Sequence, residues 1–97
     1  MEQLEQQLAS ELMARCQKIE STTGISMERL RRQTERFGGR QAVQSYLRNP
    51  CDLSVLRQHG ILADSIEALA VSEQFGALFS DDTVNACFSA LCAVDFF

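Results

Sequence analysis

The chain has little proline and no long apolar run, and both absences limit its class. Pro50 is the only proline, and the five glycines fall mostly between periodic segments, which favours helices with short connections over a β-sandwich with many turns. No apolar stretch has the length needed to cross a bilayer. The first residues include Glu2, Glu5 and Glu11 where a signal peptide needs a basic start and an apolar run, so we expect a cytoplasmic protein.

Histidine is as scarce as proline, which argues against catalysis and metal binding. A Cys–His nucleophilic pair requires His59, the only histidine, beside a cysteine and a third orienting group, and the spacing from Cys51 does not demand this. The four cysteines lack the close pairs typical of zinc sites, and Gly38-Gly39 is not part of a phosphate-loop pattern. The sequence therefore predicts a protein that is not an enzyme and has no metal or cofactor. It predicts all four cysteines as small buried hydrophobes: Cys16, Cys51, Cys87 and Cys92.

The apolar residues that are present recur at helical spacing. The chain has 97 residues, of which 45% are hydrophobic, enough for one core and one domain over 1–97. In the first segment, steps of three and four place five residues on one face: Leu4, Leu8, Leu12, Cys16 and Ile19. We predict an all-α, compact single domain of five or six short helices.

Stop and cap residues divide the rest of the chain. Ser26 predicts the start of a helix over 26–37 that buries Met27, Leu30, Thr34 and Phe37 and ends at Gly38-Gly39. Further helices are expected over 40–48 and over 53–59, the latter capped by Asp52. A capping box in which Glu67 reaches back predicts another helix after Asp64. Ser80 caps the last helix, whose expected buried residues are Val84, Cys87, Phe88 and Leu91.

The order of several short motifs resembles a small uncharacterised bacterial family of helical domains. The residues that carry the resemblance are Gly60-Ile61-Leu62, Ser65-Ile66-Glu67-Ala68-Leu69, Phe75 and Leu78-Phe79-Ser80-Asp81-Asp82. They are similar to that family's "G-x-L-x-x-[ST]-[VI]-E-A-L" and "F-x-x-L-F-[ST]-[DE]-[DE]" segments, and Gly38-Gly39, Ala42 and Leu47 resemble an upstream segment. Arg57, Ala63 and Thr83 depart from the pattern, standing where tryptophan, aspartate and an acid are usual. The resemblance implies a bacterial helical domain and no mechanism, because the family has no established activity.

Charge is distributed unevenly. All nine basic residues lie between Arg15 and Arg57 with four acids, a net charge of +5, whereas the two flanks together carry nine acids and no base. Arg29, Arg32 and Arg36, called here the arginine row, share one face of the expected second helix, and Arg40 follows the glycine pair. We interpret the chain as a helical protein-interaction module that binds a protein partner through this charge-polarised surface. A solvated or internally paired face is the simpler interpretation of the same row.

Three alternatives for binding remain open. The arginine row could bind nucleic acid, although an isoelectric point near 4.8 disfavours binding to a polyanion. The acidic C-terminal residues could instead imitate nucleic acid, as in a small inhibitor from a mobile element, and they are Asp64, Glu67, Glu73, Asp81 and Asp82. A homodimer could form through the leucines of the first helix, and the pair Phe96-Phe97 could close the core or mark an interface.

Overall fold

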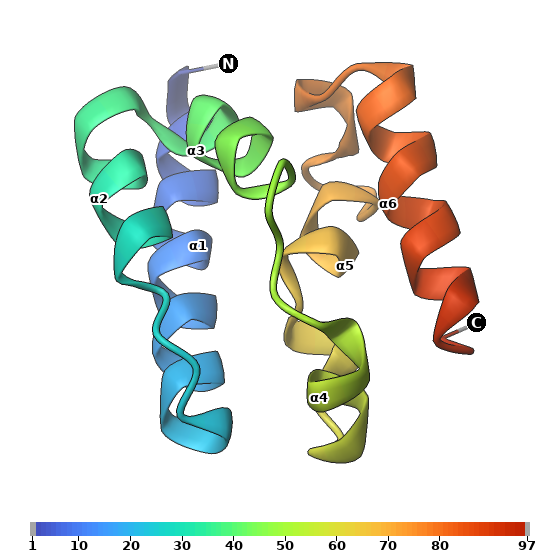
Figure 1. Ribbon diagram of the computed structural model, residues 1–97. Coiled ribbons are helices and arrows are strands. Elements are labelled where there is room, and N and C mark those ends of the chain that lie inside the picture. The colour runs from blue at the N-terminus through green and yellow to red at the C-terminus, as the bar shows by residue number, and fades with distance from the viewer. Residues whose placement is uncertain (1, 97) are drawn as a thin grey trace.

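The computed structural model of the protein describes residues 2–96, and this part of the chain contains helices and no strand. The elements are α1 (Glu2–Thr23), α2 (Glu28–Phe37), α3 (Gly39–Tyr46), α4 (Leu53–Gln58), the 3-10 helix η1 (Leu62–Asp64), α5 (Ile66–Ala70), the 3-10 helix η2 (Gly76–Leu78) and α6 (Asp81–Ala93) (Figure 1). The Cα radius of gyration is 12.3 Å, close to the roughly 13 Å of a compact chain of this size. The predicted all-α fold is therefore confirmed.

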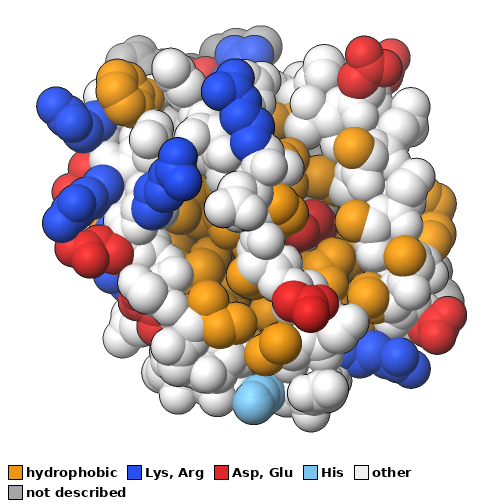
Figure 2. Space-filling model, viewed as in Figure 1, with side chains coloured by type: hydrophobic (Ala, Val, Ile, Leu, Met, Phe, Trp, Pro, Cys, Tyr) orange, Lys and Arg blue, Asp and Glu red, His pale blue; other side chains and the backbone are white. Residues whose placement is uncertain are grey.

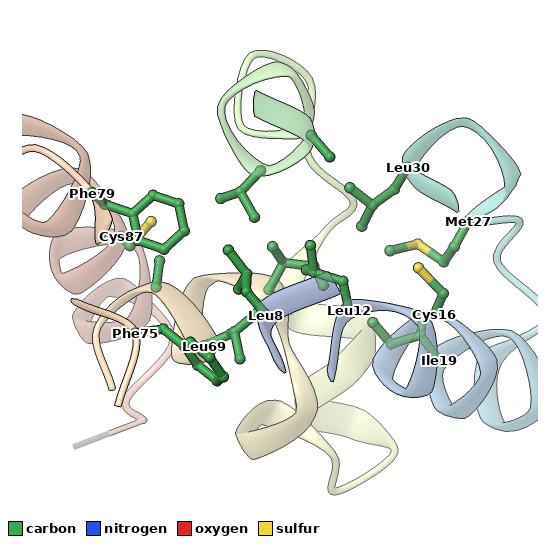
Figure 3. Packing of buried hydrophobic residues seen from close by; sticks show 14 of the residues in the cluster. Leu8, Leu12, Cys16, Ile19, Met27, Leu30, Leu69, Phe75, Phe79 and Cys87 are labelled. Atoms are coloured by element: carbon green, nitrogen blue, oxygen red, sulfur yellow. The ribbon is translucent and has the colours of Figure 1, made fainter. Parts of the chain in front are cut away.

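The apolar face of α1 forms the centre of the core. Leu8, Leu12, Cys16 and Ile19 are completely buried, as their helical spacing predicted. Figure 3 shows Met27 and Leu30 of α2 lying toward Cys16 and Ile19, while Leu69 and Phe75 approach the Leu8 end. Leu8 and Leu12, two of the three leucines considered for a homodimer interface, therefore lie inside the domain, and the homodimer stays a prediction.

The Gly38-Gly39 pair joins α2 to α3 and lets α3 approach α1. Gly38 has a φ of 87°, a left-handed conformation that favours glycine. Gly39 is buried, and a Cβ added there would lie 2.8 Å from Leu8 Cγ and 3.3 Å from Leu12 Cδ1. The second glycine therefore has a packing role that its position as a helix stop did not predict.

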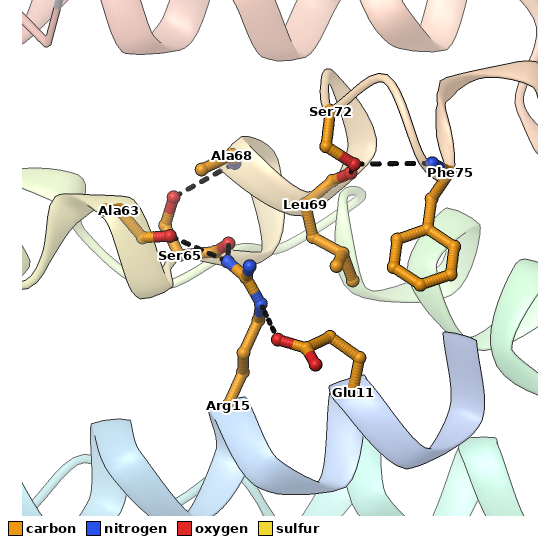
Figure 4. A network of polar contacts seen from close by, with 8 residues as sticks. All are labelled: Glu11, Arg15, Ala63, Ser65, Ala68, Leu69, Ser72 and Phe75. Carbon is orange, nitrogen blue, oxygen red and sulfur yellow. Dashed lines mark hydrogen bonds and ion pairs between the residues drawn. The ribbon is translucent and has the colours of Figure 1, made fainter. Parts of the chain in front are cut away.

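Arg15 connects α1 to the C-terminal half of the chain. Its guanidinium donates hydrogen bonds of 2.8 Å to the backbone oxygens of Ala63 and Ser65, and its Nε lies 3.2 Å from Glu11 Oε1 (Figure 4). Ser65 in turn caps α5, because its hydroxyl accepts a hydrogen bond from the Ala68 amide. One arginine thus fixes the start of α5 against the first helix.

Two cap predictions are confirmed and two are wrong. Asp52 accepts from the Ser54 amide and Ser80 from the Thr83 amide, so both cap their helices as expected. Met27, and not Ser26, is the N-cap residue of α2, although the Ser26 hydroxyl still accepts from the Glu28 amide at 3.4 Å. Glu67 does not complete a capping box with Asp64, because Ser65 is the N-cap residue of α5, and its Oε1 has no hydrogen-bond partner among the described residues.

Some side chains expected in the core are exposed. Phe37 is 52% exposed because it is the last residue of α2, beyond the turn that covers Leu30 and Thr34. Phe88 is 48% exposed because α6 lies at the edge of the molecule and packs mainly against α5, which leaves only the narrow stripe of Cys87 and Leu91 buried (Figure 1). Cys92, expected to be buried, lies outside that stripe and is exposed. Phe96 is half-buried, and Phe97 lies outside the described residues.

Candidate interaction surface

Helix α2 presents the arginine row to solvent because its opposite face is held in the core. Met27 and Leu30 are each 3% exposed, and the Thr34 hydroxyl donates to the Leu30 carbonyl within the helix. Arg29, Arg32 and Arg36 lie on the outer face and are exposed, as their three- and four-residue spacing predicted. The row is therefore a real feature of the surface.

Ion pairs neutralise part of this surface. Arg32 Nη2 lies 2.8 Å from Glu28 Oε1 on the same helix, and Arg40 Nη1 lies 3.4 Å from Glu5 Oε1 of α1. Exposed pairs of this kind contribute at most about 1 kcal/mol and are weakened by salt. Arg29, Arg36 and Arg48 have no carboxylate within ion-pair distance among the described side chains.

Exposed residues of α2, α3 and the turn that follows α3 form one basic surface, defined here by Arg29, Arg32, Arg36, Arg40, Arg48 and Phe37. Figure 2 shows most of the Lys and Arg side chains gathered on the side of these helices, with some acidic side chains beside them and others spread over the rest of this face. Two shallow hollows of about 500 and 470 Å³ lie on it and share Gln33 and Phe37. The residues that line the two hollows include five arginines and two acids, Glu5 and Glu28, which gives the lining a net charge of +3.

Phe37 belongs to this surface and not to the core. The guanidinium carbon of Arg36 lies 5.9 Å from the centre of the Phe37 ring, near the limit of a cation–π contact. An exposed aromatic ring among guanidinium groups is a common composition for a protein-binding surface, where aromatic and arginine side chains are enriched. The periodicity of α2 aligns this ring with Leu30, but the ring lies at the end of the helix, beyond the part that the core covers.

A separate apolar pocket of about 230 Å³ lies between α2 and α3. Its apolar lining comes from Met27, Leu30, Ala42, Tyr46, Pro50 and Cys51. Arg29 lines both this pocket and the larger hollow over the arginine row, so the apolar and basic features are continuous. No local sequence pattern predicts the pocket, because it forms where three segments pack together.

The predicted acidic face is only partly present. Glu67 is 2% exposed and belongs to the core, so its inclusion in that face was wrong. Four of the five residues of α5 are buried against neighbouring elements: Ile66, Glu67, Leu69 and Ala70. Asp64 is half-buried, and the exposed acids are Glu73, Asp81 and Asp82. Asp81 and Asp82 lie in the first turn of α6, where negative charge stabilises the helix dipole.

The buried carboxyl of Glu67 acts electrostatically on two residues that line the apolar pocket, Tyr46 and Cys51. Burial raises the pKa of the Glu67 carboxyl. Burial first, and then the charge of Glu67, raises the pKa values of both Tyr46 and Cys51. The Tyr46 hydroxyl donates to Cys51 Sγ at 3.0 Å and accepts from the Cys51 amide at 3.1 Å. This arrangement fixes the loop between α3 and α4 with Tyr46 as its hydrogen-bonding centre.

The thiols of Cys16, Cys51 and Cys87 are poor candidates for nucleophiles. Burial raises the pKa values of Cys16 and Cys87 to about 11, and it also raises that of the half-buried Cys51. A thiol with a raised pKa stays protonated at neutral pH, and the thiolate is the reactive form. His59 is the exposed C-cap residue of α4, with no hydrogen bond to a cysteine within the described part of the chain.

Two searches of the described residues give negative findings. No group of three or more His, Cys, Asp or Glu side chains within 2–96 is arranged to hold a metal ion. None of the helices in this range has the length and hydrophobicity of a membrane span.

Comparison of the chain with protein-family models, with curated proteins and with solved structures finds no match. The resemblance to a bacterial helical family therefore stays a prediction. The features of the molecule that bear on function are the basic surface and the apolar pocket beside it.

Proposed function

We propose that the chain is a non-enzymatic protein-interaction module whose basic surface on α2 and α3 binds an acidic protein partner. The observation that carries the proposal is the surplus of unpaired guanidinium groups on a chain of net charge −4. Arg29, Arg36 and Arg48 keep their charges without a carboxylate partner among the described side chains, so they are available to an external one.

An acidic protein suits this surface better than nucleic acid does. A duplex presents a long array of phosphates, and binding gains from releasing many counterions, which requires a broad positive field. Here the surplus is +3 on one surface, and the acids elsewhere give the whole molecule the same sign as the duplex. A protein partner contacts a smaller area and also uses apolar contacts, which Phe37 and the adjoining pocket offer.

Charge reversal at two unpaired arginines tests the proposal. The probe is a fluorescein-labelled glutamate peptide, measured by fluorescence polarisation over a salt series. We expect the Arg29→Glu, Arg36→Glu double variant to weaken binding by about tenfold or more at low salt, because two attractive contacts become repulsive. The matched control is Lys18→Glu with Arg57→Glu, which makes the same change in net charge at exposed positions outside the surface and should bind nearly as the wild type does.

Two outcomes contradict the proposal. The first is no binding of the glutamate peptide to the folded wild type at low salt. The second is tighter binding of a labelled DNA duplex than of the peptide, lost in the same double variant, which would assign the surface to nucleic acid.

A further inference from the structure

The apolar pocket between α2 and α3 has a size that suits one large side chain. Its volume of about 230 Å³ lies below the roughly 300–1,000 Å³ of pockets that hold cofactors or drug-sized ligands. It exceeds the roughly 150 Å³ of an apolar cavity that accepts benzene. The pocket therefore fits a phenylalanine, leucine or methionine side chain better than a small-molecule ligand.

The rim of the pocket offers hydrogen-bonding groups that the protein itself does not use. Gln33, Ser45 and Asn49 line the pocket, and their side chains make no hydrogen bond to any other described residue. Amide and hydroxyl groups beside an apolar pocket can pair with the backbone of a peptide that enters it. A rim of this kind suits a polypeptide segment.

The charge beside the pocket has one sign. Arg29 is the only charged residue among those that line it, and this guanidinium has no ion-pair partner in the described part of the chain. From Arg29, the row continues through Arg32 to Arg36, a distance of roughly 10 Å at the 1.5 Å rise per residue of a helix. A segment whose apolar side chain occupies the pocket therefore places its neighbouring residues over a line of positive charge.

We infer that the pocket receives one large apolar side chain of an acidic peptide segment, whose carboxylates then pair with Arg29 and Arg36. This inference rests on the proposed function and adds the chemistry of the partner to it. The apolar side chain supplies affinity through burial, and the carboxylates set the direction in which the segment lies across α2.

The loop between α3 and α4 forms part of the pocket wall and is tied to α3 by hydrogen bonds. The wall opposite α2 includes Tyr46, Pro50 and Cys51, and the two hydrogen bonds between Tyr46 and Cys51 hold that wall in place. A preformed wall lowers the ordering cost of binding. The hydrogen-bonded turn is therefore part of the proposed site.

The test compares a short labelled peptide that carries one phenylalanine beside several glutamates with the same peptide after Phe→Ala exchange. We expect the alanine peptide to bind about tenfold more weakly or worse, because a buried aromatic ring is lost. Ser45→Leu fills the pocket from α3, so this variant should bind the two peptides equally. Ser10→Leu makes the same exchange at an exposed position of α1 that lines neither the pocket nor the two hollows, and it should keep the difference.

Each outcome decides a separate point. Equal binding of both peptides to the wild type, with loss of both in the Arg29→Glu, Arg36→Glu variant, overturns the pocket and leaves the proposed function standing. No binding of either peptide overturns both. If Ser45→Leu does not fold, amide shifts decide: changes at Ala42, Tyr46 and Cys51 with the phenylalanine peptide alone support the site, and their absence rejects it. Self-association that Ser45→Leu abolishes would assign the pocket to a second copy of the chain, against the inference.

Discussion

The two halves of the chain differ in how their acidic side chains are accommodated. In α1 and α2, acids pair with nearby arginines, as Glu11 does with Arg15 and Glu20 with Arg31, and a surplus of guanidinium groups remains on the surface. After Arg57 the chain has no lysine or arginine, so its acids either stay in solvent or, at Glu67, enter the core. Asp95 reaches back toward Arg57 at 3.8 Å. Composition therefore decides the polarity of the surface, whereas packing decides which charged side chains are buried at a cost in stability.

Arg15 is the cation by which the basic half stabilises the acidic half, and its loss should have the largest effect on stability. Arg15→Met keeps the aliphatic stem but leaves the carbonyls of Ala63 and Ser65 without this donor. Charge-assisted hydrogen bonds contribute about 1.5–3 kcal/mol each, so we expect the free energy of unfolding to fall by about 2–4 kcal/mol in a urea titration. Arg32→Met removes an exposed ion pair and should change it by less than about 1 kcal/mol. Equal losses in both variants would mean that the halves are not joined at Arg15.

Much of the fold followed from local sequence signals. The stripe from Leu8 to Ile19 and the caps at Asp52 and Ser80 depend on neighbours within one or two helical turns, and the structure confirms them. The arginine row was predictable for the same reason, since it belongs to one helix. The Arg40–Glu5 pair joins residues 35 positions apart, and no local pattern indicates it.

The features that were missed depend on how much of an element its neighbours cover. The five-residue α5 is surrounded, so Glu67 is buried although it is charged. Helix α6 is covered on one side only, so Phe88 is exposed although it is apolar. Periodicity gives the direction in which a side chain points and not the width of the contact. The apolar pocket was unpredictable for a related reason, because α2, α3 and the following loop each supply part of it.

Removing the charge of Glu67 should increase the stability of the protein. Burial raises the pKa of its carboxyl above the ordinary value of 4.5, so the folded chain holds this proton more tightly than the unfolded chain does. The contribution to stability is therefore fully present below pH 4.5 and is lost as the pH rises through the elevated pKa. We expect Glu67→Met to raise the free energy of unfolding at pH 8 by about 1–3 kcal/mol, since an apolar side chain of similar length needs no partner for Oε1.

The measurement for Glu67 is a series of urea titrations from acidic to alkaline pH. Above pH 4.5, the wild type should lose stability as the pH rises, and Glu67→Met should lose much less of it. Glu73→Met, at an exposed acid of the same half, serves as the control and should keep the wild-type slope. A slope that is unchanged in Glu67→Met would show that the buried carboxyl is not its cause.

Substitution of the exposed acids at the start of α6 should have the smallest effect on the free energy of unfolding, unlike substitution of the buried Glu67. Asp81 and Asp82 lie in the first turn, where a carboxylate stabilises a helix by about 0.3–1 kcal/mol at low ionic strength. Asp81→Asn with Asp82→Asn should therefore lower the free energy of unfolding by about 1 kcal/mol in low salt and by less in high salt, because these charges are exposed and screened. Glu73→Gln removes an exposed acid outside any helix and should leave stability nearly unchanged. If the aspartate variant is as stable as this control at low salt, the C-terminal acids do not stabilise α6, and their value to the molecule lies only in its surface charge.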